Sequence, residues 1–127
     1  MASAAKHRIL VVDDETTFIR MVKLNLEGTG RFEVLGEANG LQAARTAQTF
    51  KPDLILLDVV MPDADGGDVA KKLREDPLLK DVPIVFLTAT VSREDSAQEL
   101  RRIGEYLYLA KPIPLEELLA CIERHLK

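Results

Sequence analysis

The chain has 127 residues, of which 46% are hydrophobic and 30% are charged, and its formal net charge is -4 at pH 7. This length suits one domain with its own core, and the net negative charge argues against direct nucleic-acid binding, which needs a basic face. Cys121 is the single cysteine, so no internal disulfide can form, and no apolar run approaches the ~20 residues of a membrane helix. The first residues also lack the apolar core of a signal peptide. We therefore expect a cytoplasmic protein without membrane contact.

The first half of the chain alternates apolar runs with amphipathic stretches. The first expected strand covers residues 9–12, and a stripe of apolar residues over 18–26 then predicts a helix. This helix should end near Gly28 and Gly30, because glycine can take the left-handed conformation of a helix C-terminus. A second strand is expected at 32–38. The second helix follows over 41–50 and is closed by Lys51 and Pro52.

The second half repeats the alternation. Strands are expected at 54–57, 84–87 and 106–110, and several of these runs are apolar throughout, as in strands covered on both faces. Apolar spacing predicts a third helix around 69–73 and a last helix over 115–126. Between them, Ser92 and Asp95 resemble a capping box and should open a fourth helix.

This strand–helix alternation predicts an α/β fold, a doubly wound five-stranded parallel sheet with five helices on its two faces. No linker, repeat or low-complexity segment interrupts the pattern. Residues 1–127 are therefore expected to form one domain, with its core from about residue 8 to residue 126.

Polar residues follow four of the expected strands, at the edge where open parallel sheets bind their ligands. They are Asp13 and Asp14 after the first strand, Asp58 after the third, Thr88 after the fourth and Lys111 after the fifth. Two unit charges about 4 Å apart repel by roughly 4 kcal/mol at an effective dielectric of about 20. Three carboxylates at one edge therefore argue for a bound hard cation, and Mg²⁺ prefers oxygen ligands of this kind.

The same set of residues suits phosphoryl chemistry. The hydroxyl of Thr88 and the ammonium of Lys111 can bind the oxygens of a phosphoryl group, while Asp58 is placed to act as a nucleophile and form an acyl phosphate. Phosphoryl transfer needs mainly positioning and charge neutralisation, so a separate general base is not required. We expect Asp58 to be a phosphoacceptor.

Four segments, in order, carry a resemblance to a known family. They are Val-Val-Asp-Asp-Glu at 11–15, Leu-Leu-Asp-Val-Val-Met-Pro at 56–62 with Asp65-Gly66, Leu-Thr-Ala at 87–89, and Tyr-Leu-Ala-Lys-Pro at 108–112. Together they resemble the receiver domain of the bacterial two-component response regulators. The resemblance spans Arg8 to about Leu126 and implies a flavodoxin-like (CheY-like) fold.

The resemblance also implies a role for each matching residue. Asp58 would accept a phosphoryl group from a sensor histidine kinase or a phosphotransfer protein, with Mg²⁺ held by Asp13, Asp14, Asp58 and the backbone carbonyl of Val60. Thr88 and Lys111 would contact the phosphoryl group, and Tyr108 would be the aromatic switch residue. The Lys111–Pro112 bond would be cis. Val60 and Thr90 flank the site and suggest slow to moderate self-dephosphorylation.

The implied activity is that of a phosphorylation-controlled switch, a phosphoacceptor that assists its own reactions and not a conventional enzyme. The surface of the fourth helix, fifth strand and last helix would change its affinity for an unknown downstream protein, and a phosphorylation-dependent homodimer is also allowed. No output domain is expected in this chain.

Other functions remain open on the sequence. A receiver-like scaffold that is never phosphorylated would share the fold. A phosphatase of the haloacid dehalogenase type also uses a strand-end Asp nucleophile, but it normally has a second Asp two residues later, where this chain has Val60, and it needs room for a cap domain. Flavin binding on such a sheet is disfavoured, because the chain has no Gly-rich phosphate loop and no tryptophan.

Overall fold

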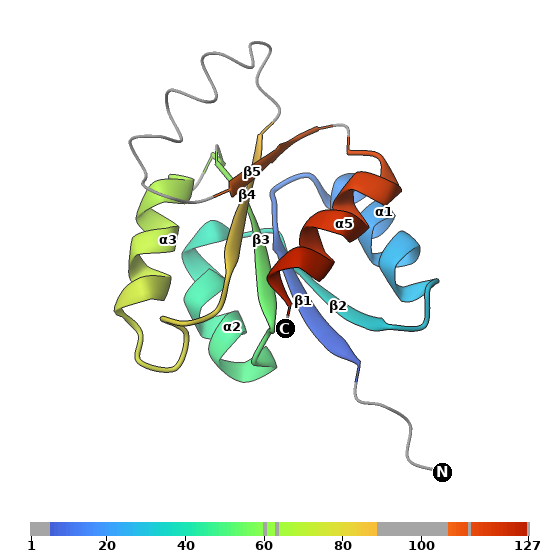
Figure 1. Cartoon of the computed structure of the whole chain (residues 1–127). Coiled ribbons are helices and arrows are strands. Elements are labelled where there is room, and N and C mark those ends of the chain that lie inside the picture. The colour runs from blue at the N-terminus through green and yellow to red at the C-terminus, as the bar shows by residue number, and fades with distance from the viewer. Residues whose placement is uncertain (1–5, 60, 63, 89–106, 112, 127) are drawn as a thin grey trace.

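A computed structural model of the chain describes residues 6–59, 61–62, 64–88, 107–111 and 113–126. Five parallel strands form one sheet in the order β2-β1-β3-β4-β5 (Figure 1). The strands are β1 His7–Val12, β2 Phe32–Glu37, β3 Leu54–Asp58, β4 Ile84–Thr88 and β5 Leu107–Ala110. The predicted doubly wound parallel sheet is confirmed.

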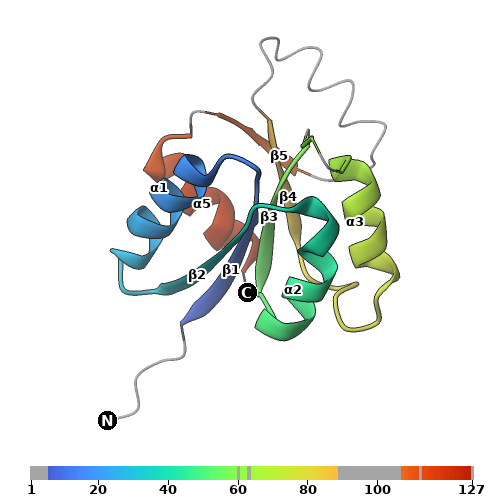
Figure 2. The ribbon, with the colours of Figure 1, turned by 180° about the vertical axis from the view of Figure 1, so that it is seen from behind.

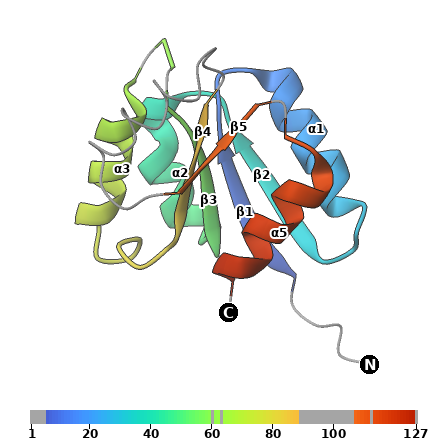
Figure 3. The ribbon, with the colours of Figure 1, turned by 45° about the horizontal axis from the view of Figure 1, so that its top comes forward.

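Helices cover both faces of this sheet. They are α1 Thr16–Glu27, α2 Ala43–Phe50, α3 Gly66–Glu75 and α5 Leu115–His125, with a short 3-10 turn η1 at Gly40–Gln42. Figures 1 and 2 show α1 and α5 on one side of the sheet and α2 and α3 on the other, and Figure 3 shows the same layers with the top of the molecule tilted forward. The helix predicted from Ser92 falls outside the described residues. Among the described helices, none has the length and apolar character needed to cross a membrane.

The buried strands explain why the apolar runs are continuous. In β1, Ile9 and Val11 pack toward α1 and α5, whereas Leu10 and Val12 pack toward α2 and α3, and all four are fully buried. Successive residues of a strand point to opposite faces. A strand covered on both sides therefore needs an apolar side chain at every position.

Two strands are one residue longer than predicted. The sequence places Asp58 and Thr88 just after their strands, but they are the last residues of β3 and β4. The backbone ladder explains this, because Val59 N–H donates to the Leu87 carbonyl at 2.9 Å and Lys111 N–H donates to the Thr88 carbonyl at 2.7 Å. Regular sheet hydrogen bonds thus hold the backbone at the ends of both strands.

Helix ends differ more from the predictions. Gly28 stays right-handed at the end of α1, and Gly30 takes the positive φ of 79°. The predicted second helix starts late: Leu41 lies in η1 and is 61% exposed, since the Asn39 side chain accepts a hydrogen bond from Leu41 N–H and begins a 3-10 turn there. Lys51, with φ 56°, ends α2 in the left-handed conformation.

The strand order creates a switch point between β1 and β3. From β1 the chain passes through α1 to β2 on one side, and it then crosses through α2 to β3 on the other side of β1. The connections that leave β1 and β3 therefore diverge, and open α/β sheets bind ligands in the crevice this produces. Asp13 and Asp58 flank this crevice.

Candidate functional site

Three carboxylates meet at the switch point. Asp13, Asp14 and Asp58 each offer one oxygen, and these oxygens lie within 4.8 Å of one another. Asp13 is fully buried and Asp58 is 5% exposed, whereas Asp14 faces solvent. The structure thus brings together the three acids that the sequence placed at this edge.

Asp13 is held by the backbone on both sides. Its N–H donates to the Glu37 carbonyl at 3.0 Å, which extends the β1–β2 pairing, and its Oδ1 accepts a hydrogen bond from Glu15 N–H at 2.9 Å. Its Oδ2 is buried and accepts no well-aligned hydrogen bond from any described residue. Lys111 Nζ lies 2.5 Å from this oxygen, so the contact is an ion pair without hydrogen-bond direction.

Lys111 brings a positive charge into the acid cluster. Its side chain is only 8% exposed, and its Nζ donates to Glu15 Oε1 at 2.7 Å and lies 3.9 Å from Asp58 Oδ2. Burial on its own would lower the pKa of Lys111, but the contacts with Asp13 and Glu15 outweigh it and leave the pKa raised. The sequence argument assigned the neutralising charge to a metal ion alone, whereas Lys111 already supplies part of it.

Two neighbours of Lys111 were given no role from the sequence, although Glu15 follows the acid pair directly in the matching segment 11–15. Glu15 accepts its hydrogen bond, and the ring of Phe18 lies below the ammonium, with 4.3 Å between Nζ and the ring centroid. This is the geometry of a cation–π contact. The available signal was spacing, since residues three apart at the start of a helix share one face, next to the acid pair.

The other predicted site residues are only partly placed by the structure. Thr88 is 3% exposed at the end of β4, opposite Ala110 in β5. Tyr108 is paired with Phe86 in the sheet register, but its side chain is not among the described parts of the chain. Val60, Thr90 and Pro112 also lie outside the described residues. The predicted cis Lys111–Pro112 bond therefore lies outside them too.

A glycine allows α3 to start directly against the end of β3. A Cβ atom on Gly66 would lie 2.5 Å from the Asp58 carbonyl oxygen and 2.8 Å from Val59 Cα. Gly66 N–H donates to the Val59 carbonyl at 2.9 Å, and the Asp65 side chain caps α3 by accepting from Gly67 N–H at 2.7 Å. The two glycines therefore serve the turn after Asp58.

The donor set fits a hard divalent cation. The three candidate ligands among the described residues are carboxylates, and Mg²⁺ and Ca²⁺ take oxygen ligands. The buried Asp13 Oδ2, with its ion-pair contact but no aligned hydrogen bond, leaves lone-pair capacity for such an ion. Mg²⁺ binds through few protein carboxylates and retains water or phosphate in its other positions, which agrees with the exposure of Asp14.

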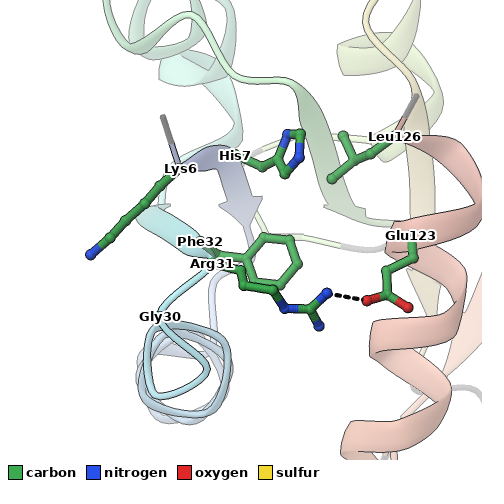
Figure 4. Close-up of a pocket in the computed structure, with 7 residues that line it drawn as sticks. All are labelled: Lys6, His7, Gly30, Arg31, Phe32, Glu123 and Leu126. Atoms are coloured by element: carbon green, nitrogen blue, oxygen red, sulfur yellow. Dashed lines mark hydrogen bonds and ion pairs between the residues drawn. The ribbon is translucent and has the colours of Figure 1, made fainter. Parts of the chain in front are cut away.

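A pocket of about 420 Å³ lies at the other end of the sheet (Figure 4). It is lined by Lys6, His7, Gly30, Arg31, Phe32, Glu123 and Leu126. Its size is that of a small-molecule site. However, Arg31 is already paired with Glu123, and β1 runs from His7 at this pocket to Val12 beside the acid cluster. The pocket is thus separate from the acidic edge.

Comparison with known proteins identifies the same fold and family. A family model described as "Response regulator receiver domain" matches residues 9–123. The Vibrio cholerae chemotaxis protein CheY4 has a similar structure, with a TM-score of 0.84 and 35% identity over 96% of this chain and 100% of that one. The polar-differentiation response regulator DivK of Brucella anthropi is 30% identical over 93% of this chain and 94% of its own length.

Longer relatives match over one part of their length. The alkaline phosphatase synthesis transcriptional regulatory protein PhoP of Bacillus subtilis is 38% identical over 94% of this chain and 48% of its own length. The chain spans about half the length of PhoP and of other curated relatives that it matches. The family match nevertheless covers nearly the whole chain, from Ile9, the first buried residue of β1, to the last turn of α5. The chain belongs to the receiver domains of two-component response regulators.

Proposed function

We propose that this protein is a phosphorylation-activated signalling switch in which Asp58 accepts a phosphoryl group in a Mg²⁺-dependent reaction. The observation that carries the proposal is the position of Asp58. Its carboxylate stands at the buried end of β3, within 4.8 Å of Asp13 and Asp14 oxygens and 3.9 Å from Lys111 Nζ. A nucleophilic carboxylate is therefore combined with groups that neutralise a phosphoryl group.

Each residue has a distinct role in this proposal. An Asp58 oxygen attacks the phosphorus atom, the new O–P bond forms, and the bond from phosphorus to the donor breaks. Asp13, Asp14, Asp58 and the Val60 carbonyl would hold Mg²⁺, which when bound neutralises charge on the transferring phosphoryl oxygens. Thr88 donates a hydrogen bond to the phosphoryl group, and Lys111 neutralises another oxygen. The protein is then a phosphoacceptor that assists its own phosphorylation and dephosphorylation, and not a conventional enzyme.

The proposed partners follow from this chemistry. A sensor histidine kinase or a phosphotransfer protein supplies the phosphoryl group, and one receiver domain with its core at about 8–126 accepts it. Tyr108 couples the site to the surface formed by the predicted fourth helix, β5 and α5, which binds a downstream protein or a second copy of the chain. Reversing a two-state equilibrium from 1:99 to 99:1 requires roughly 5.5 kcal/mol of differential binding. A phosphoryl group with several charged contacts is a suitable source of that energy.

The test is intact-mass spectrometry after incubation with acetyl phosphate. One phosphoryl group should add in the presence of Mg²⁺ and should be missing with a chelator and in Asp58→Asn. A folded protein that never gains this mass would instead be a receiver-like scaffold. Rapid hydrolysis of acetyl phosphate by the wild type but not by Asp58→Asn, without a trapped adduct, would favour an aspartate-nucleophile phosphatase or a short-lived switch.

A further inference from the structure

We propose that Glu15 is a positioning residue that competes with the phosphoryl group on Asp58 for the ammonium of Lys111. The inference rests on the proposed function and extends it to a residue outside the set of phosphoacceptor, metal ligands and phosphoryl contacts. By holding Lys111 in the unphosphorylated state, the Glu15 carboxylate weakens the affinity of the site for a phosphoryl donor.

Two carboxylates hold the ammonium of Lys111 in this structure. Its Nζ is 2.7 Å from Glu15 Oε1 but 3.9 Å from Asp58 Oδ2, so in this structure the ammonium lies closer to the carboxylates of Glu15 and Asp13 than to that of Asp58. An ammonium has three protons to donate. Glu15 accepts one of these protons, and Asp13 lies against the same ammonium. A phosphoryl oxygen that accepts another proton therefore shares the positive charge of Lys111 with two carboxylates that already attract it.

Glu15 lies at the N-terminus of α1, where a shorter side chain is usual. Glu15 is the N-cap residue of α1, where the Ile19 N–H bonds to its carbonyl, yet among the described contacts its side chain makes no capping hydrogen bond. N-caps favour Ser, Thr, Asp, Asn and Gly, whose short side chains reach the free N–H groups. A longer Glu here gives up the cap and reaches Lys111 instead. Such departures from local preference are expected at functional sites.

Glu15 is also the contact that Lys111 can exchange most easily. The Glu15 side chain is 55% exposed, whereas that of Asp13 is fully buried. An exposed ion pair contributes little because water screens it. If Glu15 releases the ammonium, Asp13 and the Phe18 ring still keep it beside Asp58. Lys111 can thus turn to a phosphoryl oxygen without leaving the site.

The experiment compares Glu15→Gln with the wild type in acetyl phosphate titrations with saturating Mg²⁺. Gln keeps the size of the side chain and removes its charge. We expect the half-saturating acetyl phosphate concentration to fall roughly two- to fivefold, the range that corresponds to an exposed ion pair. The maximal phosphorylation rate should stay within about twofold, because the groups that act on the phosphorus are unchanged. Binding of beryllium fluoride, a non-covalent phosphoryl mimic, should tighten by a similar factor.

Asp65→Asn is the matched control. It removes one carboxylate at the same edge of the sheet and keeps a capping side chain on α3, since Asn also accepts from Gly67 N–H. Its half-saturating concentration should change by less than the change in Glu15→Gln. If both variants lower the half-saturating concentration equally, general charge repulsion explains the result and the proposal is overturned. A Glu15→Gln variant with the same half-saturating concentration as the wild type would also overturn it. A wild type that forms no adduct would overturn the proposed function as well.

Discussion

The ammonium of Lys111 partly neutralises the carboxylates at the acidic edge of the sheet. Its ammonium is 2.5 Å from the fully buried Asp13 and also contacts Glu15. Removing one partner of a buried ion pair leaves the other charge uncompensated, which costs far more than the pair contributes when intact. Lys111 therefore stabilises the folded state in addition to its proposed role toward the phosphoryl group.

We predict that Lys111→Met lowers the free energy of unfolding by about 3 kcal/mol in metal-free buffer. The pKa of Lys111 is raised above its ordinary value of 10.5. Its stabilisation should therefore be constant at neutral pH and be lost as pH rises above that value toward the folded-state pKa. Urea unfolding of both proteins at several pH values measures this difference. Lys71→Met, at an exposed lysine of α3, should match the wild type; an equally large loss there would contradict the assignment.

At the scale of elements, the start of α3 and the end of β3 position Asp58 together. Gly66 N–H donates to the Val59 carbonyl, and the absence of a side chain on Gly66 lets the helix approach the Asp58 backbone. This close approach is a requirement of packing, because Gly66 does not have a positive φ. The position of Asp58, the proposed nucleophile, thus depends on a residue that carries no functional group.

We predict that Gly66→Ala destabilises the protein by about 1–3 kcal/mol, as overpacking does, despite the better helix propensity of Ala. The added methyl would lie 2.5 Å from the Asp58 carbonyl oxygen, so the end of β3 must shift. Phosphorylation of Asp58 should slow in the same variant. Thermal unfolding and the acetyl phosphate reaction test both effects, with Lys72→Ala on the exposed side of α3 as the neutral comparison. Wild-type stability in Gly66→Ala would refute the packing argument.

Elements and strand-end residues could be predicted because each depends on a short stretch of sequence. Five apolar-rich runs, several of them apolar throughout, indicated the strands, and the residues after them indicated the acids at one edge. The Lys111–Glu15 contact could not be predicted in this way, since it joins residues 96 positions apart through side-chain conformations. Apolar periodicity also failed to predict the late start of α2, because the side-chain hydrogen bond of Asn39 begins a 3-10 turn at that point.

At the scale of the whole molecule, the strand order 2-1-3-4-5 gathers the acids at one end of the sheet. Asp13 and Asp14 follow β1, and Asp58 ends β3. These two strands are neighbours in the sheet, although 41 residues lie between the end of β1 and the start of β3. Only the folded chain therefore offers the three carboxylates together. An ion that binds this set binds the native state far better than the unfolded state, so it must stabilise the fold.

We predict that Mg²⁺ at ten times its dissociation constant raises the free energy of unfolding by about 1.4 kcal/mol, and that a chelator reverses the gain. Thermal unfolding in a Mg²⁺ titration, with NaCl at matched ionic strength, measures the effect. In Asp13→Asn the response should be largely lost, because a buried ligand charge is gone. An equal response of both proteins would place the ion elsewhere, since only binding at this cluster depends on the Asp13 carboxylate.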